Sequence, residues 1–273
     1  GLTAALMSSF LLYVLSFQTN DQGSYIDTNS SMLSVYWVVI IFTLLVSLGI
    51  WLSLKDVTNK KFDKHDWSFS KALEIAKNLN VWLLGIIVLT AYCGYKNVDN
   101  YSTYLVTVQK VTLVESASFT STIFWLRPIA ALLSGFFADA ITKKVKGGRF
   151  LTLTYFFILG AISQFLISFK VFTSFALVFN ILLSAAGFGY ALRSIYFAVF
   201  GEFKIPNNLT GTTVGIVSLV GFMPDMFFGT LTGHLIDTNP GELGFIHVFN
   251  LTGLFLTLGS LACLASYYRV RKN

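Results

Sequence analysis

The stretch MLSVYWVVIIFTLLVSLGIWLSL, residues 32–54, runs for twenty-three residues without a charged side chain. A helix needs about 20 predominantly apolar residues to cross the hydrocarbon core of a bilayer. This stretch is therefore predicted to be a membrane-spanning helix, and similar stretches recur along the chain.

The composition supports the same class of protein. The chain has 273 residues, of which 55% are hydrophobic and only 12% are charged. Soluble domains average about 25% charged residues, so this chain has too few to cover the surface of a soluble fold. A soluble enzyme, a nucleic-acid-binding protein and a disordered protein are thereby excluded. Cys93 and Cys263 each lie inside an apolar run, which argues against a disulfide framework.

Eight apolar stretches are long enough, or nearly so, to cross a membrane. They predict an all-α, polytopic membrane protein with eight transmembrane helices. Since the chain begins inside an apolar run and without Met, we expect it to be a piece of a longer protein. The stretches are Gly1–Phe17, Met32–Leu54, 81 to about 106, Ser116–Ala138, Phe150–Phe169, Val171–Phe200, Leu209–Gly233 and Phe245–Tyr268.

Lysine and arginine predict the orientation of these helices. Fourteen of these residues fall in the connections and the tail on one side, whereas only Lys110 and Lys170 fall in connections on the other. The positive-inside rule therefore places the C-terminus in the cytoplasm, together with the long connection at residues 55–80, which we interpret as an amphipathic linker at the membrane surface. The net charge of +6 thus reflects topology, and nucleic acid is not an expected partner.

Five charged residues remain at membrane depth: Lys96, Asp99, Arg127, Arg193 and Asp225. A charge near the bilayer centre costs at least about 2.5 kcal/mol, so each should face protein or water. Lys96 either contacts a solute, reaches the interface, or pairs with Asp99 at the i+3 position. Arg127, about 16 Å into its helix, either binds a solute or clamps a neighbouring helix.

The other two charges also have alternative interpretations. Asp225 follows Pro224 and is either a proton site or the counter-ion of Arg127 or Arg193. Arg193 either contacts a solute or pairs with Glu202 or Asp225. Tyrosines lie within about a turn of these cations, which suggests an aqueous cavity lined by rings; they are Tyr92, Tyr95, Tyr190 and Tyr196.

Glycine spacing and missing motifs add two expectations. Gly211 and Gly215, and then Gly229 and Gly233, have the GxxxG spacing that lets membrane helices pack closely. No cluster has metal-ligand spacing, and no phosphate-binding loop or catalytic triad is visible. We therefore expect no metal, no cofactor and no catalytic residue, and we do not expect an enzyme.

One connection resembles a known signature. Residues 135–149 read GFFADAITKKVKGGR, with Gly135, Asp139 four residues later, and then basic residues as far as Arg149. This resembles the cytoplasmic-loop motif of the major facilitator superfamily, although Ala140 stands where that motif has a basic residue. The resemblance implies twelve helices in two six-helix halves. Residues 1–54 would be the last two helices of the first half, 55–80 the linker, and 81–273 the whole second half.

The resemblance also implies roles for individual residues. The seventh and tenth helices of the superfamily line the central cavity, and here they carry Lys96, Asp99, Tyr190 and Arg193. The eighth and eleventh helices line the interface between halves and carry Arg127 and Asp225. The inner gate would contain three residues: Asp139, Arg149 and Glu202.

Together these observations predict a secondary active transporter that works by alternating access. Because buried cations outnumber buried carboxylates, we expect a small anionic solute: a sugar acid, an organophosphate or a carboxylate. Residues 98–105, VDNYSTYL, and the pair Pro224 and Asp225 are similar to organic-anion and sugar-acid carriers of the superfamily. Two alternatives remain open, a proton-coupled symporter of a neutral sugar and a non-transporting receptor or scaffold with the same fold.

A transporter of this kind is expected in the inner membrane of a cell, which the chain would cross several times. The expected partners are the solute, membrane lipid, and protons or an exchanged anion. The full-length protein is expected to function as a monomer, as either a symporter or an antiporter.

Overall fold

The computed structural model describes residues 28–53, 75–172, 174–203 and 207–272, and the regular elements in these ranges are all helical. The chain divides into two compact units, Gly1–Trp67 and Ser68–Asn273. In the first unit, α2 (Thr28–Ser53) has 26 residues and is therefore about 39 Å long. It contains most of the predicted span at 32–54, while the predicted span at 1–17 lies outside the described residues.

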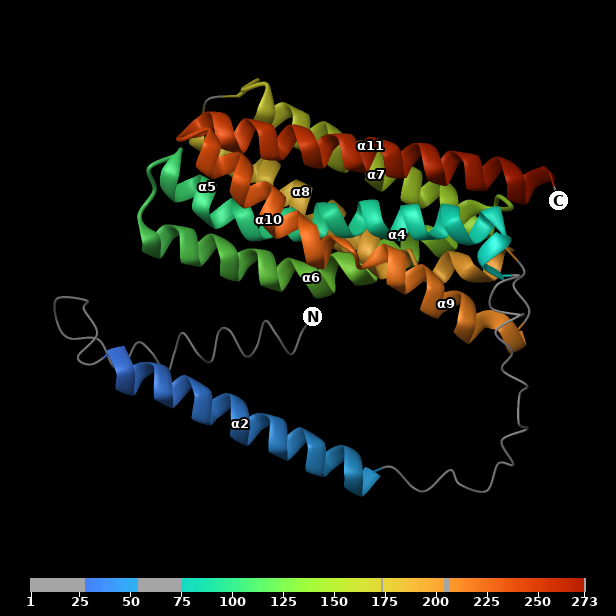
Figure 1. Cartoon of the computed structure of the whole chain (residues 1–273), viewed down its shortest axis with the longest axis horizontal. Helices are drawn as coiled ribbons and strands as arrows, with labels where there is room; N and C mark the ends of the chain where they lie inside the picture. The colour runs from blue at the N-terminus through green and yellow to red at the C-terminus, as the bar shows by residue number, and fades with distance from the viewer. Residues whose placement is uncertain (1–27, 54–74, 173, 204–206, 273) are drawn as a thin grey trace. The chain divides into compact units, whose positions relative to one another are not determined.

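The second unit is a bundle of helices (Figure 1). Together with α2, the described residues contain seven helical segments long and apolar enough to cross a membrane, so the chain is a polytopic, all-helical membrane protein. The elements of the bundle are α4 (Leu79–Asn97), η1 (Val98–Asn100), α5 (Tyr101–Thr107), α6 (Leu113–Thr142), α7 (Gly148–Ser168), α8 (Phe175–Ile195), η2 (Ala198–Phe203), α9 (Asn207–Gly221), α10 (Pro224–Thr238) and α11 (Glu242–Lys272).

Two of the predicted spans are interrupted helices. The span from residue 79 to 107 consists of α4, the single 3-10 turn η1, and α5. The span from residue 210 to 238 consists of α9 and α10, and Pro224 begins the second piece. Proline has no backbone N–H, which suits the first turn of a helix and cannot continue the hydrogen bonding of a preceding one.

By contrast, α6 is continuous. It carries Pro128 in its interior and runs for 30 residues, from a capping box formed by Thr112 and Glu115 to Thr142. It is therefore longer at both ends than the predicted stretch at 116–138. A proline inside a membrane helix is tolerated where neighbouring groups satisfy the freed backbone carbonyl.

Close packing in the bundle is centred on α11, which lies along α7 and α4, while α6 lies along α8 and α9 along α4 (Figure 1). A methyl group added at Gly259 of α11 would overlap the ring of Phe157 on α7, and one added at Gly253 would lie 2.8 Å from the ring of Phe165. These glycines allow the helices to approach closely.

In the second unit no neighbouring helix packs closely on the GxxxG glycines of the described residues, so a role for them in helix packing stays a prediction. An added methyl group would meet no atom within 4 Å at any of the four glycines concerned, which are Gly211, Gly215, Gly229 and Gly233. Spacing alone identifies a smooth face of a helix, whereas the partner that covers the face depends on tertiary structure.

Candidate functional site

Eight side chains from four spans gather around the two helix interruptions, and we call them the central cluster. The first four lie on α4 and η1, the fifth on α6, the next two on α8 and the last on α10. The residues are Tyr92, Tyr95, Lys96, Asp99, Arg127, Tyr190, Arg193 and Asp225.

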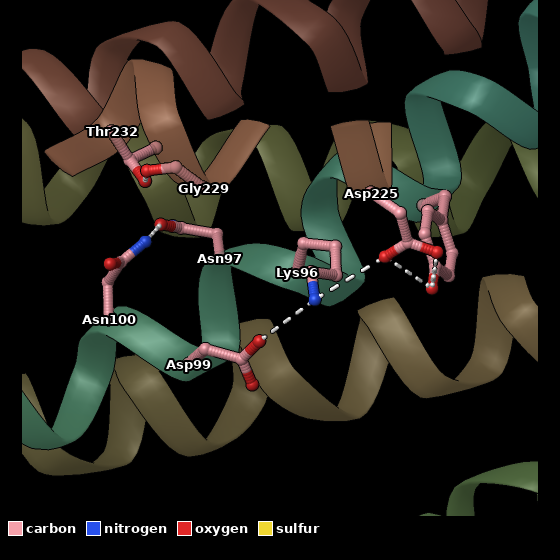
Figure 2. A network of polar contacts seen from close by, with 8 residues as sticks. Lys96, Asn97, Asp99, Asn100, Asp225, Gly229 and Thr232 are labelled. Atoms are coloured by element: carbon pink, nitrogen blue, oxygen red, sulfur yellow. Dashed lines mark hydrogen bonds and ion pairs between the residues drawn. The ribbon is translucent and has the colours of Figure 1, made fainter. Parts of the chain in front are cut away.

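Lys96 bridges two carboxylates (Figure 2). Its Nζ lies 3.4 Å from Oδ2 of Asp99 and 3.5 Å from Oδ1 of Asp225. The hydroxyl of Tyr92 donates to the same Asp225 carboxylate, with distances of 3.1 and 2.9 Å to its two oxygens. Lys96 therefore links the interruption between α4 and α5 to the start of α10.

These contacts decide between some of the sequence-based alternatives. Lys96 does pair with Asp99 across one helical turn, as one alternative had it. Asp225 is a counter-ion of Lys96, whereas the sequence argument had offered Arg127 or Arg193. Its role in coupling to protons stays a prediction.

The two arginines of the central cluster lie over aromatic rings. The Cζ of Arg127 lies 4.5, 5.0 and 5.6 Å from the ring centres of Phe124, Tyr190 and Tyr95. The Cζ of Arg193 lies 4.1 Å from the ring centre of Tyr95 and 5.6 Å from that of Tyr92. The face of an aromatic ring attracts a cation, an interaction worth roughly 0.5–2 kcal/mol.

Neither arginine forms an ion pair within 4.0 Å with any carboxylate in the described part of the chain. The proposed pairing of Arg193 with Glu202 or Asp225 is therefore absent there, because α8 directs Arg193 towards rings on α4. Rings stabilise a guanidinium but neutralise none of its charge, so both arginines keep a full positive charge.

Two polar atoms of the central cluster are buried without a hydrogen-bond partner: Nε of Arg127 and the hydroxyl oxygen of Tyr190. Tyr190 as a whole is 4% exposed. A buried polar group without a partner costs about 1–3 kcal/mol, and more when it is charged. The guanidinium of Arg127 and the hydroxyl of Tyr190 interact with each other, so these two groups partly compensate for each other's burial.

The three residues assigned to an inner gate also lie together, and we call them the inner cluster. Nη2 of Arg149 lies 3.4 Å from Oδ1 of Asp139, and the backbone N–H of Arg149 donates to Oε1 of Glu202 at 3.1 Å. These contacts join the end of α6, the start of α7 and η2. Whether the inner cluster acts as a gate stays a prediction.

Glu202 of the inner cluster has an unusual environment. Its Oε2 is buried without a hydrogen-bond partner in the described ranges. It lies beside Gly147, which adopts a φ of 82° just before α7 begins. Burial raises the pKa of Glu202 above its ordinary value of 4.5, while the backbone N–H and the charge of Arg149 act in the opposite direction.

A chain of amides beside the central cluster was not predicted from the sequence. The amide group of Asn100 donates to Asn97, Asn97 donates to Gln164 at 3.1 Å, and Gln164 donates to the hydroxyl of Tyr101 at 2.8 Å. Asn97, Gln164 and Tyr101 are each no more than 1% exposed. The available signal was the occurrence of Asn and Gln inside apolar stretches, where an unpaired amide is costly.

No group of three or more His, Cys, Asp or Glu residues in the described ranges could hold a metal ion. The side chains of the central cluster are cations, carboxylates, hydroxyl groups and aromatic rings.

No protein-family model matches the chain. The chain is 26% identical to the inner membrane protein YihN of Escherichia coli over 204 residues, which is 73% of this chain and 47% of YihN. It is also 26% identical to the inner membrane protein YqcE of the same organism over 247 residues, or 88% of this chain and 56% of YqcE. The chain thus spans about half the length of these curated relatives and is distantly related to both.

Proposed function

We propose that the chain is the C-terminal portion of a major facilitator superfamily carrier that moves a small organic anion by alternating access. Residues 81–273 form the second six-helix half, and 1–54 hold the last two helices of the first half. The carrier lies in an inner membrane, as the names of both relatives suggest, with its C-terminus in the cytoplasm.

The observation that carries this proposal is the excess of positive charge in the central cluster. Three cations face two carboxylates, and both carboxylates are held by the same lysine. The two arginines carry charge that no carboxylate of the cluster offsets. Because unpaired charge at membrane depth is costly and typically marks a solute pathway, an anionic solute suits this arrangement.

The helix interruptions support transport as the function. Substrate sites of secondary transporters typically lie at the bilayer midplane, beside discontinuous helices. Here the two interruptions meet at the contact between Lys96 and Asp225. The inner cluster, which joins the end of α6, the start of α7 and η2, would close the cytoplasmic side of the carrier. The carrier needs no cofactor or metal, acts as a monomer in lipid, and couples transport to protons or to an exchanged anion.

The test is solute flux into liposomes containing the full-length protein. We expect saturable uptake of an organic anion, with uptake lost in Arg127→Gln and retained in Arg271→Gln, which removes an exposed cation from the end of α11. Binding without flux would identify a receptor or scaffold. Uptake of a neutral sugar that depends on Asp225 but not on Arg127 would instead identify a proton-coupled sugar symporter.

A further inference from the structure

One side chain of α7 contacts both ends of the interruption between α4 and α5. Oε1 of Gln164 accepts a hydrogen bond at 3.1 Å from Asn97, the last residue of α4. Nε2 of Gln164 donates at 2.8 Å to the hydroxyl of Tyr101, the first residue of α5. The 3-10 turn η1 lies between these two contacts, so a single amide group spans the interruption.

The local sequence does not by itself require an interruption at this place. Residues 98–100 read VDN and contain neither Pro nor Gly, the residues that commonly break a helix. Asn100 donates to Asn97, three positions before it, and side chains three apart eclipse one another in a 3-10 turn (Figure 2). The polar contacts of Asn97, rather than the local composition, therefore fit the 3-10 form.

These contacts are buried and lie on a well-anchored helix. Asn97, Gln164 and Tyr101 are each no more than 1% exposed, so breaking either contact of Gln164 leaves a polar group without water to replace the partner. The residue after Gln164 is Phe165, and a methyl group added at Gly253 of α11 would lie 2.8 Å from its ring. The interruption is therefore tied to the closely packed pair of α7 and α11.

The same interruption carries two members of the central cluster on another face. Lys96 directly precedes Asn97, and Asp99 lies within η1 (Figure 2). Lys96 reaches Asp225 at the start of α10, where the distance between Nζ and Oδ1 is 3.5 Å. A small displacement of the interruption would lengthen this contact beyond the range of an ion pair.

We infer that Gln164 is a positioning residue, which fixes the shape of the interruption and thereby holds Lys96 within reach of Asp225. Gln164 acts through Asn97 and Tyr101 and needs no contact with a solute. The inference rests on the proposed function in one respect only, that the contact held in this way belongs to the solute pathway.

The coupling between Lys96 and Asp225 tests this positioning role. It is the difference between the effects of Asp225→Asn on the free energy of unfolding when residue 96 is Lys and when it is Gln. It is measured for the full-length protein in detergent micelles, with Gln164 and with Gln164→Met, which keeps an unbranched side chain and removes both hydrogen bonds. We expect Gln164→Met to reduce the coupling to about half or less. An unchanged coupling would overturn the inference, as would the absence of coupling in the wild type.

Thr152→Val provides the matched control on the same helix. Thr152 is also fully buried on α7, but its hydroxyl donates to the carbonyl of Gly148 in its own helix. Its removal should destabilise the protein and leave the coupling unchanged. An equal loss of coupling in Thr152→Val would show that any weakening of α7 has this effect, and the inference would be wrong.

A paired variant separates positioning from stability. Gln164→Met alone leaves the amide group of Asn97 buried without its acceptor. In Asn97→Leu combined with Gln164→Met both amides become apolar side chains of similar shape, an exchange that can be nearly neutral for stability. We expect this variant to unfold at nearly the wild-type denaturant concentration while its coupling stays reduced. Wild-type coupling in this variant would overturn the inference.

The failure of this inference and the failure of the proposed function are distinguishable, because the coupling is measured without a solute. If the coupling does not depend on Gln164 but the liposomes take up an organic anion, the proposed function stands and the positioning role is wrong. If the coupling depends on Gln164 but no anion is taken up, the positioning role stands and the proposed function is wrong.

Discussion

Replacing Lys96 by glutamine would leave two carboxylates facing each other without their shared cation. Oδ2 of Asp99 and Oδ1 of Asp225 lie no more than 6.9 Å apart, which is the two N–O distances of 3.4 and 3.5 Å laid end to end. The variant therefore loses two ion pairs and also creates a repulsion that the wild type does not have.

The magnitude follows from this separation. Two unit charges 6.9 Å apart repel by about 2.4 kcal/mol at an effective dielectric constant of 20 and by about 0.6 kcal/mol in water. The side chains of Asp99 and Asp225 are 67% and 51% exposed, which favours the lower part of this range. Each lost ion pair adds about 0–1 kcal/mol. We expect Lys96→Gln to lower the free energy of unfolding by about 1–3 kcal/mol.

A change at Asp225 should have opposite effects in the two backgrounds. With Lys96 present, Asp225→Asn removes an ion pair and should destabilise the protein by up to about 1 kcal/mol. In the Lys96→Gln background the same change removes the repulsion and should restore stability. Contacting residues commonly show such coupling, at 0.5–3 kcal/mol.

The assay is denaturant unfolding of the full-length protein in detergent micelles, followed for wild type, both single variants and the double variant. The bridging role of Lys96 is refuted if Asp225→Asn is destabilising in both backgrounds by the same amount. Asp99→Asn provides a second arm, because it should show the same reversal of sign.

Three further predictions concern other parts of the molecule. Burial raises the pKa of Glu202, so its carboxyl keeps a proton in the folded state at pH values where the unfolded chain has released it. The free energy of unfolding should therefore fall as the pH rises from 4.5 through the raised pKa. In Glu202→Gln the thermal midpoint should depend less on pH across this range, and an unchanged dependence would contradict the assignment. The predicted topology can be tested by cysteine labelling in a background that lacks the two buried native cysteines. A membrane-impermeant thiol reagent added outside should label Asp237→Cys but not Lys146→Cys, and the reverse pattern would show that the predicted orientation is inverted. For packing, Gly259→Ala should destabilise by about 1–3 kcal/mol because its methyl group overlaps a ring on α7, whereas Gly229→Ala meets no atom within 4 Å and should be neutral or stabilising in the same unfolding assay.

The sequence was sufficient for features that depend on local composition. Apolar runs located the seven helical segments of the described residues that are long and apolar enough to cross a membrane, because the length of a spanning helix is set by the thickness of the bilayer. The i+3 spacing also suggested the contact between Lys96 and Asp99, since residues three apart share a helix face.

Features that depend on tertiary contacts were harder to predict. Lys96 and Asp225 are 129 positions apart, and nothing in either segment identifies the other as its partner. The interruption at Val98–Asn100 contains neither Pro nor Gly, and it lies within the amide chain that joins Asn97 to Gln164 on α7. The GxxxG glycines show the converse problem, a local signal without a partner in the described residues.

The contacts of the central cluster separate its cations into two kinds. Lys96 has two carboxylate partners that are themselves about half exposed or more, so its ion pairs are weak and can be exchanged at little cost when the helices rearrange. Arg127 has no carboxylate within 4.0 Å in the described ranges, and its guanidinium lies over aromatic rings. A positive charge at membrane depth without a carboxylate partner is costly, and an anion bound beside it would reduce that cost. If the proposed function is correct, binding at Arg127 and rearrangement at Lys96 are separable steps, and we predict that substitutions at Arg127 change solute affinity whereas substitutions at Lys96 change the conformational equilibrium.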